Sequence, residues 1–170
     1  MVGLPVFVGG ETDQLQAFVQ VGTVEAMRLP TPAFLELIGQ QPDLEGVMSR
    51  YVQWSYFGMA QWVLCARLHP LEERMARWLL MCHDRLAIDQ FPLTHEYIAQ
   101  MLGVRRPSVA IAAGTLRQAG LVEYHRGIVS ILDRPRLEEA ACERNRVSAA
   151  EYRRLIGRDP QATYAGRGEV

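Results

Sequence analysis

The sequence has no lysine, no long apolar run and only three cysteines. Its 170 residues include 18 cationic side chains, all of them arginine. Each cation is therefore a planar guanidinium that can bind phosphate or carboxylate through two hydrogen bonds. The longest uncharged stretch, residues 53–66, is shorter than the ~20 apolar residues that span a bilayer, and no basic segment leads into an apolar signal sequence. We therefore expect a cytoplasmic protein with no membrane partner.

The three cysteines, Cys65, Cys82 and Cys142, are too few and too scattered for a disulfide framework or a paired-cysteine metal site. Buried, reduced thiols are the simpler interpretation. Cys65 and His69 are four residues apart and could share a metal ion, and His83 follows Cys82. Because no carboxylates accompany them, we expect no catalytic site, metal or cofactor, and hence no enzyme.

The net charge of −1 hides a difference between the two parts of the chain. Residues 1–66 have two arginines against six acidic residues, a net charge of −4. Residues 67–170 have sixteen arginines against thirteen acidic residues, a net charge of +3, and residues 93–136 alone reach +3. Such asymmetry weakly indicates a nucleic-acid partner.

The N-terminal region has the composition of short strands. Residues Val2–Val8, Ala17–Val21 and Val24–Leu29 are rich in β-branched and apolar side chains and are separated by glycine and polar residues. A short helix is predicted at Pro32–Ile38. These patterns place a small effector-like region at residues 1–42.

A long helix is predicted from an N-cap at Asp43 up to Pro70, with residues 43–68 as a dimerisation helix. Ser55 and Gly58 are small and would let two such helices approach closely. The alternative is a core helix of a monomer. The seam has alternating spacing of four and three residues: Leu44, Met48, Tyr51, Ser55, Gly58, Trp62 and Cys65. A second apolar stripe contains Val47, Trp54, Phe57 and Val63. The residues expected to form the dimer contact are Met48, Tyr51, Ser55, Gly58 and Trp62.

Two short helices follow the amphipathic helix predicted at Leu71–Leu86. Thr94 is the candidate N-cap of the first, Glu96–Leu102, and Gly103 ends it. The second is predicted at Val109–Ala119. Two helices this close, joined by a turn that contains glycine, predict a helix-turn-helix.

A hairpin is predicted next, with strands at Leu121–Tyr124 and Ile128–Leu132. A hairpin directly after a helix-turn-helix predicts a winged helix. Arginines at the start of the second helix would meet phosphate at a helix N-terminus, where free N–H groups already attract anions. Few side chains on the exposed face of that helix can hydrogen-bond to base edges, so we expect sparse direct readout. A winged helix used only for protein contacts is the alternative. The candidate DNA-binding residues are Thr94, Arg105, Arg106, Ser108, Thr115, His125 and Arg126.

The run LTHEYIAQMLGVRRPSVAIAAGTLRQAGLVEYHRGIVSILDR resembles the DNA-binding domain of the Crp/Fnr family of bacterial transcription regulators. The resemblance implies a homodimer on double-stranded DNA, with RNA polymerase as a candidate partner. It implies that Thr94 contacts the DNA backbone, Arg106 reads a base, Ser108 contacts phosphate and His125 lies in the wing. Two positions depart from the family pattern, because Pro107 replaces a glutamate and Ile111 replaces a second base-reading arginine. The operator therefore need not match the best-known family sequence.

The region before the long helix resembles the end of a cyclic-nucleotide-binding barrel. Leu4 stands where nucleotide binders have a glutamate, and Leu15 and Gln16 stand where they have an arginine and a hydroxyl. A buried cyclic phosphate without such partners is strongly disfavoured, so we expect no cyclic AMP binding. Three strands cannot close an eight-stranded barrel. Either the start codon is misassigned within a longer gene, which we favour, or the regulator is truncated and has an exposed sheet edge.

The predicted fold class is α+β: an incomplete barrel remnant, a dimerisation helix and a C-terminal winged helix-turn-helix over residues 69–156. A final helix is expected at Arg136–Ile156, with Leu137, Ala140, Ala141, Val147 and Tyr152 inward, and residues 157–170 as a disordered tail. The arginines at 144, 146, 153 and 154 could contact DNA, although a solvated face is the simpler role. The alternative function is a truncated interaction module that heterodimerises with a full-length regulator.

Overall fold

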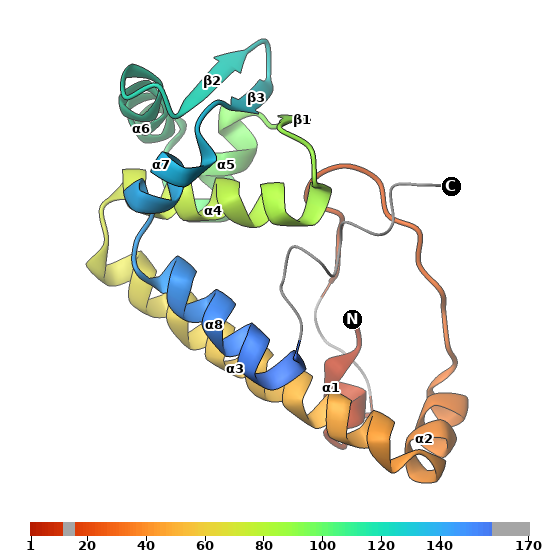
Figure 1. The fold of residues 1–170 in the computed structure, drawn as a ribbon. Coiled ribbons are helices and arrows are strands. Elements are labelled where there is room, and N and C mark those ends of the chain that lie inside the picture. Colours follow the sequence, from red (N-terminus) through yellow and green to blue (C-terminus); the bar gives the residue numbers. More distant parts are fainter. Residues whose placement is uncertain (12–15, 158–170) are drawn as a thin grey trace.

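The computed structural model describes residues 1–11 and 16–157. A winged-helix domain lies above a long helix, α3, and a second helix, α8, runs along α3 (Figure 1). The tail expected to be disordered lies, except for Gly157, outside the described residues. Among the described residues, no helix is both long enough and apolar enough to cross a membrane.

The strands expected near the N-terminus are not formed. Residues Leu4–Phe7 form a helical turn, α1, with Pro5 in its first turn, where the missing N–H does no harm. The described residues up to Leu29 contain no strand. A strand needs a neighbouring strand to satisfy its N–H and C=O groups, and the described part of this region offers none. The short helix was predicted correctly and spans Thr31–Gln40 as α2.

Helix α3 spans Pro42–Leu68, as the sequence predicted within a residue. Its N-cap is Gln41, which makes no side-chain capping bond, so the predicted cap at Asp43 is wrong. Asp43 instead lies in the first turn, where its carboxylate is favoured by the positive end of the helix dipole.

Helix α4, Leu71–Leu86, is the centre of the hydrophobic core and matches the predicted bounds. Seven of its side chains are buried, and all of them except Arg77 belong to one core cluster with residues of helix α5, His95–Leu102, helix α6, Arg106–Gln118, and the small sheet. The helix ends at Ala87, which adopts a left-handed conformation. The guanidinium of Arg74 donates a 2.6 Å hydrogen bond to the carbonyl of Leu102 and so ties α4 to the end of α5.

The sheet has three antiparallel strands in the order β1-β3-β2. Strands β2, Val122–His125, and β3, Ile128–Ile131, form the predicted hairpin. Strand β1, Gln90–Pro92, was not predicted, because three residues ending in proline show no alternation. Phe91 of β1 pairs with Val129 of β3, and both side chains are buried in the domain core.

The single C-terminal helix expected at Arg136–Ile156 is wrong. The chain forms α7, Arg134–Ala140, and α8, Arg144–Ile156, with a break between them. After the break Val147 is 42% exposed rather than inward, and Leu155 is buried instead. Helix α8 packs along α3, where the rings of Trp54 and Tyr152 meet edge to face at 5.1 Å. The mixed α and β fold with a C-terminal winged helix is confirmed.

Candidate nucleic-acid interface

The helix-turn-helix is built from local signals that the sequence contains. Helix α5, His95–Leu102, starts at Thr94, whose hydroxyl oxygen accepts a 3.2 Å hydrogen bond from the N–H of Tyr97. Gly103 ends it in a left-handed conformation at φ 66°. The N–H of Val104 then bonds to the carbonyl of Ala99 at 3.0 Å and turns the chain into the second helix. Thr94 is therefore an N-cap, as predicted.

The second helix, α6, spans Arg106–Gln118 and begins three residues earlier than predicted. Arg105 occupies its N-cap position and Arg106 its first turn, so both guanidinium groups lie at the positive end of the helix dipole. Pro107 lies in the same turn and removes only an N–H that has no helical partner. The side chains of Arg105 and Arg106 are exposed, and Ser108 is half-buried behind them.

The remaining exposed face of α6 is poor in free polar groups. Ile111 is 69% exposed. The hydroxyl of Thr115 donates a 3.3 Å hydrogen bond to the carbonyl of Ile111, so its proton is already used within the helix. These two observations are consistent with the prediction that few side chains of α6 contact base edges.

The turn between β2 and β3, which we call the wing turn, contacts the residues just before α5. Arg126 and Gly127 form the two-residue loop of the hairpin, and both have positive φ angles, 48° and 80°. Two positive φ values are those of a type I′ turn, whose twist matches the strands. The carbonyl of Gly127 accepts a 2.7 Å hydrogen bond from the N–H of Leu93. A Cβ atom at Gly127 would lie 3.6 Å from Cγ2 of Thr94, so the wing turn and the first cap are neighbours.

Charges at this end of the domain are exposed and weakly paired. The Nε of Arg106 is 3.9 Å from Oε2 of Glu96, and both side chains are more than two-thirds exposed. An ion pair of this kind contributes little to stability and leaves the guanidinium available. His95 packs edge to face on the ring of Tyr124 at 5.0 Å. Burial, and then the nearby charge of Arg106, lower the pKa of His95.

His95 was absent from the predicted site residues. Its position at the first turn of α5 gave a signal, since a residue following an N-cap lies on the same end of the domain as that cap. The structure thus brings Thr94 beside Gly127 of the wing turn, next to Arg126 in sequence, and places Arg105, Arg106 and Ser108 at the start of α6. Thr115 lies two turns further along α6, and His125 is exposed at the last residue of β2.

Three of the five predicted dimerisation residues lie beside α8 of the same chain, and the hydroxyl of Tyr51 accepts a 3.0 Å hydrogen bond from the N-terminal ammonium of Met1. Met48 is buried, and Ser55, Gly58 and Trp62 line a cavity of about 300 Å³ between α3, α4 and α8. The hydroxyl of Ser55 donates to the carbonyl of Tyr51 at 2.9 Å. The role of these residues in a dimer stays a prediction.

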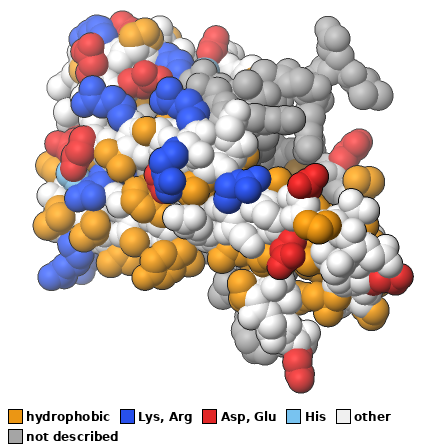
Figure 2. Space-filling model, turned by 60° about the horizontal axis from the view of Figure 1, so that its bottom comes forward, with side chains coloured by type: hydrophobic (Ala, Val, Ile, Leu, Met, Phe, Trp, Pro, Cys, Tyr) orange, Lys and Arg blue, Asp and Glu red, His pale blue; other side chains and the backbone are white. Residues whose placement is uncertain are grey.

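An adjoining face of α3 carries an apolar stripe, which we define as Val52, Tyr56, Met59 and Val63. Its members also follow a spacing of four, three and four residues, so they lie in one line along the helix. Val52 is half-buried, and Met59 also lines the cavity beside Gly58. Tyr56 is 71% exposed, and Met59 and Val63 are exposed to a similar degree. Hydrophobic side chains gather at the lower left of the space-filling view, on the side where α3 lies (Figure 2).

Comparison with known proteins shows what the domain is similar to. Residues 73–140 match the model of the Crp-like helix-turn-helix domain. A solved Crp/Fnr-family regulator from Eubacterium rectale is similar over 65% of this chain and 51% of its own, with 22% identity and a TM-score of 0.52. A Crp-family regulator from Thermus thermophilus covers 55% of this chain and 51% of its own, with 27% identity and a TM-score of 0.49. The chain thus spans about half the length of these two proteins. No curated protein matches the sequence.

Proposed function

We propose that this chain, whose residues 73–140 form a Crp-like helix-turn-helix domain, is a sequence-specific DNA-binding transcription regulator. The supporting observation is that Arg105 and Arg106 are exposed at the start of α6, with Arg106 3.9 Å from Glu96 in the first turn of α5, while the wing turn lies beside Thr94. Arginines at a helix N-terminus and in a wing provide the phosphate contacts that position a recognition helix, and Arg106 is the residue that we expect to contact guanine through two hydrogen bonds.

The backbone of Arg126 supports a functional role for its side chain. A residue other than glycine at φ 48° costs roughly 1–2 kcal/mol relative to glycine. Glycine would relieve that cost in a type I′ turn. The side chain of Arg126 is exposed, so it does not stabilise the fold in return for this strain. We therefore infer that it serves a function, namely contact with a phosphate.

The regulator acts as a homodimer in this proposal. Two recognition helices would enter successive major grooves, ~34 Å apart, on a pseudo-palindromic site. We expect the stripe of α3 to contact the second copy, because Tyr56, Met59 and Val63 are exposed, whereas Met48 is buried and Ser55, Gly58 and Trp62 line the cavity against α8. Val52, Tyr56, Met59 and Val63 have the spacing of a two-helix seam.

Cyclic AMP is not the effector in this proposal, and the protein is cytoplasmic, not an enzyme, with RNA polymerase as a candidate partner. Leu4 lies in α1 and Gln16 in an extended segment, and neither supplies a cation or a hydroxyl for a cyclic phosphate. Leu15 lies outside the described residues.

Selection of bound duplexes from a random library tests the proposal, using the purified 170-residue chain at two salt concentrations. The salt dependence separates phosphate contacts from base contacts. We expect a two-fold-symmetric motif. Sequence-blind binding, or none, would contradict direct regulation, and recovery of a motif only after a full-length relative is added would favour the heterodimerising module.

Substitution of Arg106 by alanine should weaken binding to the selected site by ~1–3 kcal/mol and relax one base position. Arg117→Ala is the matched control, since this arginine lies in the last turn of the same helix. Unchanged sequence preference in the Arg106 variant would remove that residue from the reading role.

Arg126→Gly should weaken binding uniformly across sequences and reduce the salt dependence of binding.

A further inference from the structure

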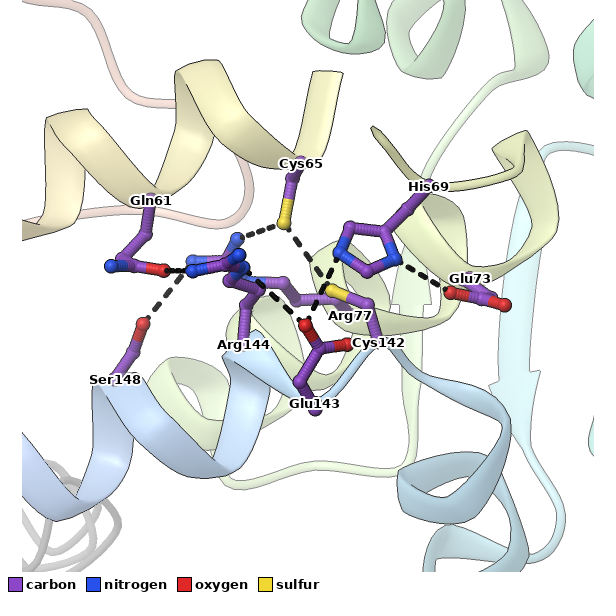
Figure 3. Close-up of polar contacts among 9 residues, drawn as sticks. All are labelled: Gln61, Cys65, His69, Glu73, Arg77, Cys142, Glu143, Arg144 and Ser148. Atoms are coloured by element: carbon purple, nitrogen blue, oxygen red, sulfur yellow. Dashed lines mark hydrogen bonds and ion pairs between the residues drawn. The ribbon is translucent and has the colours of Figure 1, made fainter. Parts of the chain in front are cut away.

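Two cysteines and a histidine from distant parts of the sequence meet beside the helix-turn-helix domain (Figure 3). Cys65 lies in the last turn of α3, His69 just beyond that helix, and Cys142 in the break between α7 and α8. The Sγ atoms of Cys65 and Cys142 are 3.3 Å apart. Each of the three residues offers one ligand atom, and all three atoms lie within 4.8 Å of one another.

His69 is oriented as metal-binding histidines are. Its Nδ1 lies 3.0 Å from Oε2 of Glu73, one turn into α4. This contact fixes the ring and leaves Nε2 directed toward the cysteines. Nε2 is buried and makes no hydrogen bond, although Oε1 of Glu143 lies at ion-pair distance, 3.5 Å away. A histidine with one nitrogen held by a carboxylate and the other buried and not hydrogen-bonded is typical of a metal ligand with its outer-shell support.

We propose that Cys65, His69 and Cys142 bind one thiophilic divalent cation, for which zinc is the best match. Glu143, whose Oε1 lies 3.5 Å from Nε2 of His69 and 3.5 Å from Nε of Arg144, would complete the set after a movement of its side chain. Two sulfurs, one imidazole nitrogen and one carboxylate oxygen form a set that suits tetrahedral zinc. At a Zn–S distance of ~2.3 Å, tetrahedral geometry separates two sulfurs by about 3.8 Å. The observed 3.3 Å requires only a small outward shift of the two side chains.

Arg77 supplies the charge that makes such a site neutral. Its side chain is 3% exposed, yet it has no carboxylate partner among the described residues. One guanidinium nitrogen donates to Sγ of Cys65 at 2.8 Å, and the other donates to Ser148 at 3.3 Å. Two thiolates, one carboxylate, one divalent cation and one guanidinium sum to zero. A buried arginine beside the sulfurs is therefore compatible with the ion and offsets the thiolate charge.

The ion would join the end of α3, the start of α4 and the start of α8 through ligands 77 residues apart in sequence.

Cobalt binding tests the site directly. The full chain, reduced with a phosphine and freed of metal, is titrated with Co²⁺ alone. We expect one ion per chain, with the intense visible bands of tetrahedral cobalt and a near-ultraviolet thiolate-to-metal transition. Zinc should displace the cobalt and bleach both features. Octahedral, weak absorption without the thiolate transition would overturn the proposal.

Substitutions identify the ligands. Cys65→Ser, Cys142→Ser and His69→Ala should each weaken zinc affinity, measured against a chromogenic chelator, by at least about 100-fold, whereas Glu143→Gln and Glu73→Gln should cost about tenfold. Cys82→Ser is the control, because burial raises the pKa of Cys82 to about 11 and its thiol lies outside the cluster. Glu72→Gln controls for Glu73. Equal losses in the controls would contradict the assignment.

A second variant keeps the test valid if a serine variant fails to fold. His69→Cys should retain the cobalt thiolate transition and strengthen it, because a third sulfur replaces the nitrogen. Loss of binding in this variant with native circular dichroism would overturn the role of position 69. Formation of a Cys65–Cys142 disulfide in air, with no metal bound under reducing conditions, would replace the metal site by a redox pair. None of these readouts depends on DNA binding.

Discussion

The N-terminal region and the winged-helix domain are made of equally apolar sequence but differ completely in burial. Between residues 71 and 140 the side chains of α4, α5, α6 and the sheet close around one core. None of the described residues in 1–42 is buried, and Val24 and Met27 are among its exposed apolar side chains. Apolar composition therefore does not itself produce a core. The partner surfaces must also be within reach.

The reason for the difference lies in where each segment finds its partners. In the winged helix α5 packs on α6 and β2 pairs with β3, which are near neighbours in sequence joined by short turns at Gly103 and Arg126-Gly127, and β1 then pairs with β3 and α7 packs on α4. The predicted N-terminal strands have no neighbouring strand in the described part of the chain. Val21 is the member of that region that packs against the domain core. The two regions should consequently respond very differently to matched substitutions.

The largest expected difference is between two phenylalanines. Phe91 is 1% exposed and Phe18 is 58% exposed. Phe91→Ala should lower the free energy of unfolding by about 3–5 kcal/mol, since it removes a buried ring and leaves a cavity. Phe18→Ala should change it by no more than about 0.5 kcal/mol. Urea unfolding followed by circular dichroism measures both, and comparable losses would show that the N-terminal region has a core of its own.

A smaller difference is expected between two threonines at helix starts. Thr94 caps α5 through its bond to the N–H of Tyr97, whereas α2 begins at Thr31 without a side-chain cap. Thr94→Ala should destabilise the protein by about 1 kcal/mol, and Thr31→Ala by much less. The same unfolding experiment applies. An effect at position 31 as large as that at position 94 would mean that α2 is coupled to the cooperative unit.

The smallest expected effect is a pH dependence that belongs to the winged helix alone. The folded protein lowers the pKa of His95, through burial and then through Arg106, so the unfolded chain binds this proton more readily. Stability should therefore rise with pH across the window just below the ordinary value of 6.5 and be fully present above it. His95→Gln should flatten that slope in unfolding curves collected between pH 5 and pH 8. A slope of opposite sign would contradict the environment described for the ring.

Sequence reasoning succeeded where the signal and its partner are adjacent. The bounds of α4, the cap at Thr94, the stop at Gly103 and the hairpin all follow from residues within a few positions. It failed at β1, since the strand character of Gln90–Pro92 comes from pairing with β3. It also missed the break at Ala141–Glu143, where the chain turns so that α8 can lie on α3.

Two misjudged features share a cause, because both depend on contacts distant in sequence. The spacing of apolar residues on α3 described two faces, but only the fold shows that α8 packs against members of both, with Tyr152 on Trp54 and a shared cavity at Gly58 and Trp62. The pairing of Cys65 with His69 was visible as a spacing of four residues, and metal binding was set aside for lack of further ligands. Cys142 and Glu143 arrive from the other end of the chain.

The hydrogen bond from Leu93 to Gly127 makes the wing turn and the start of α5 a single mechanical unit. A phosphate touching Arg126 and another touching Thr94 would be held at a fixed separation before DNA arrives. No loop has to be ordered between these two contacts, so their entropic cost is met during folding rather than during binding. The effects of substituting both residues on DNA affinity should then depart from additivity, which a double-mutant cycle reports.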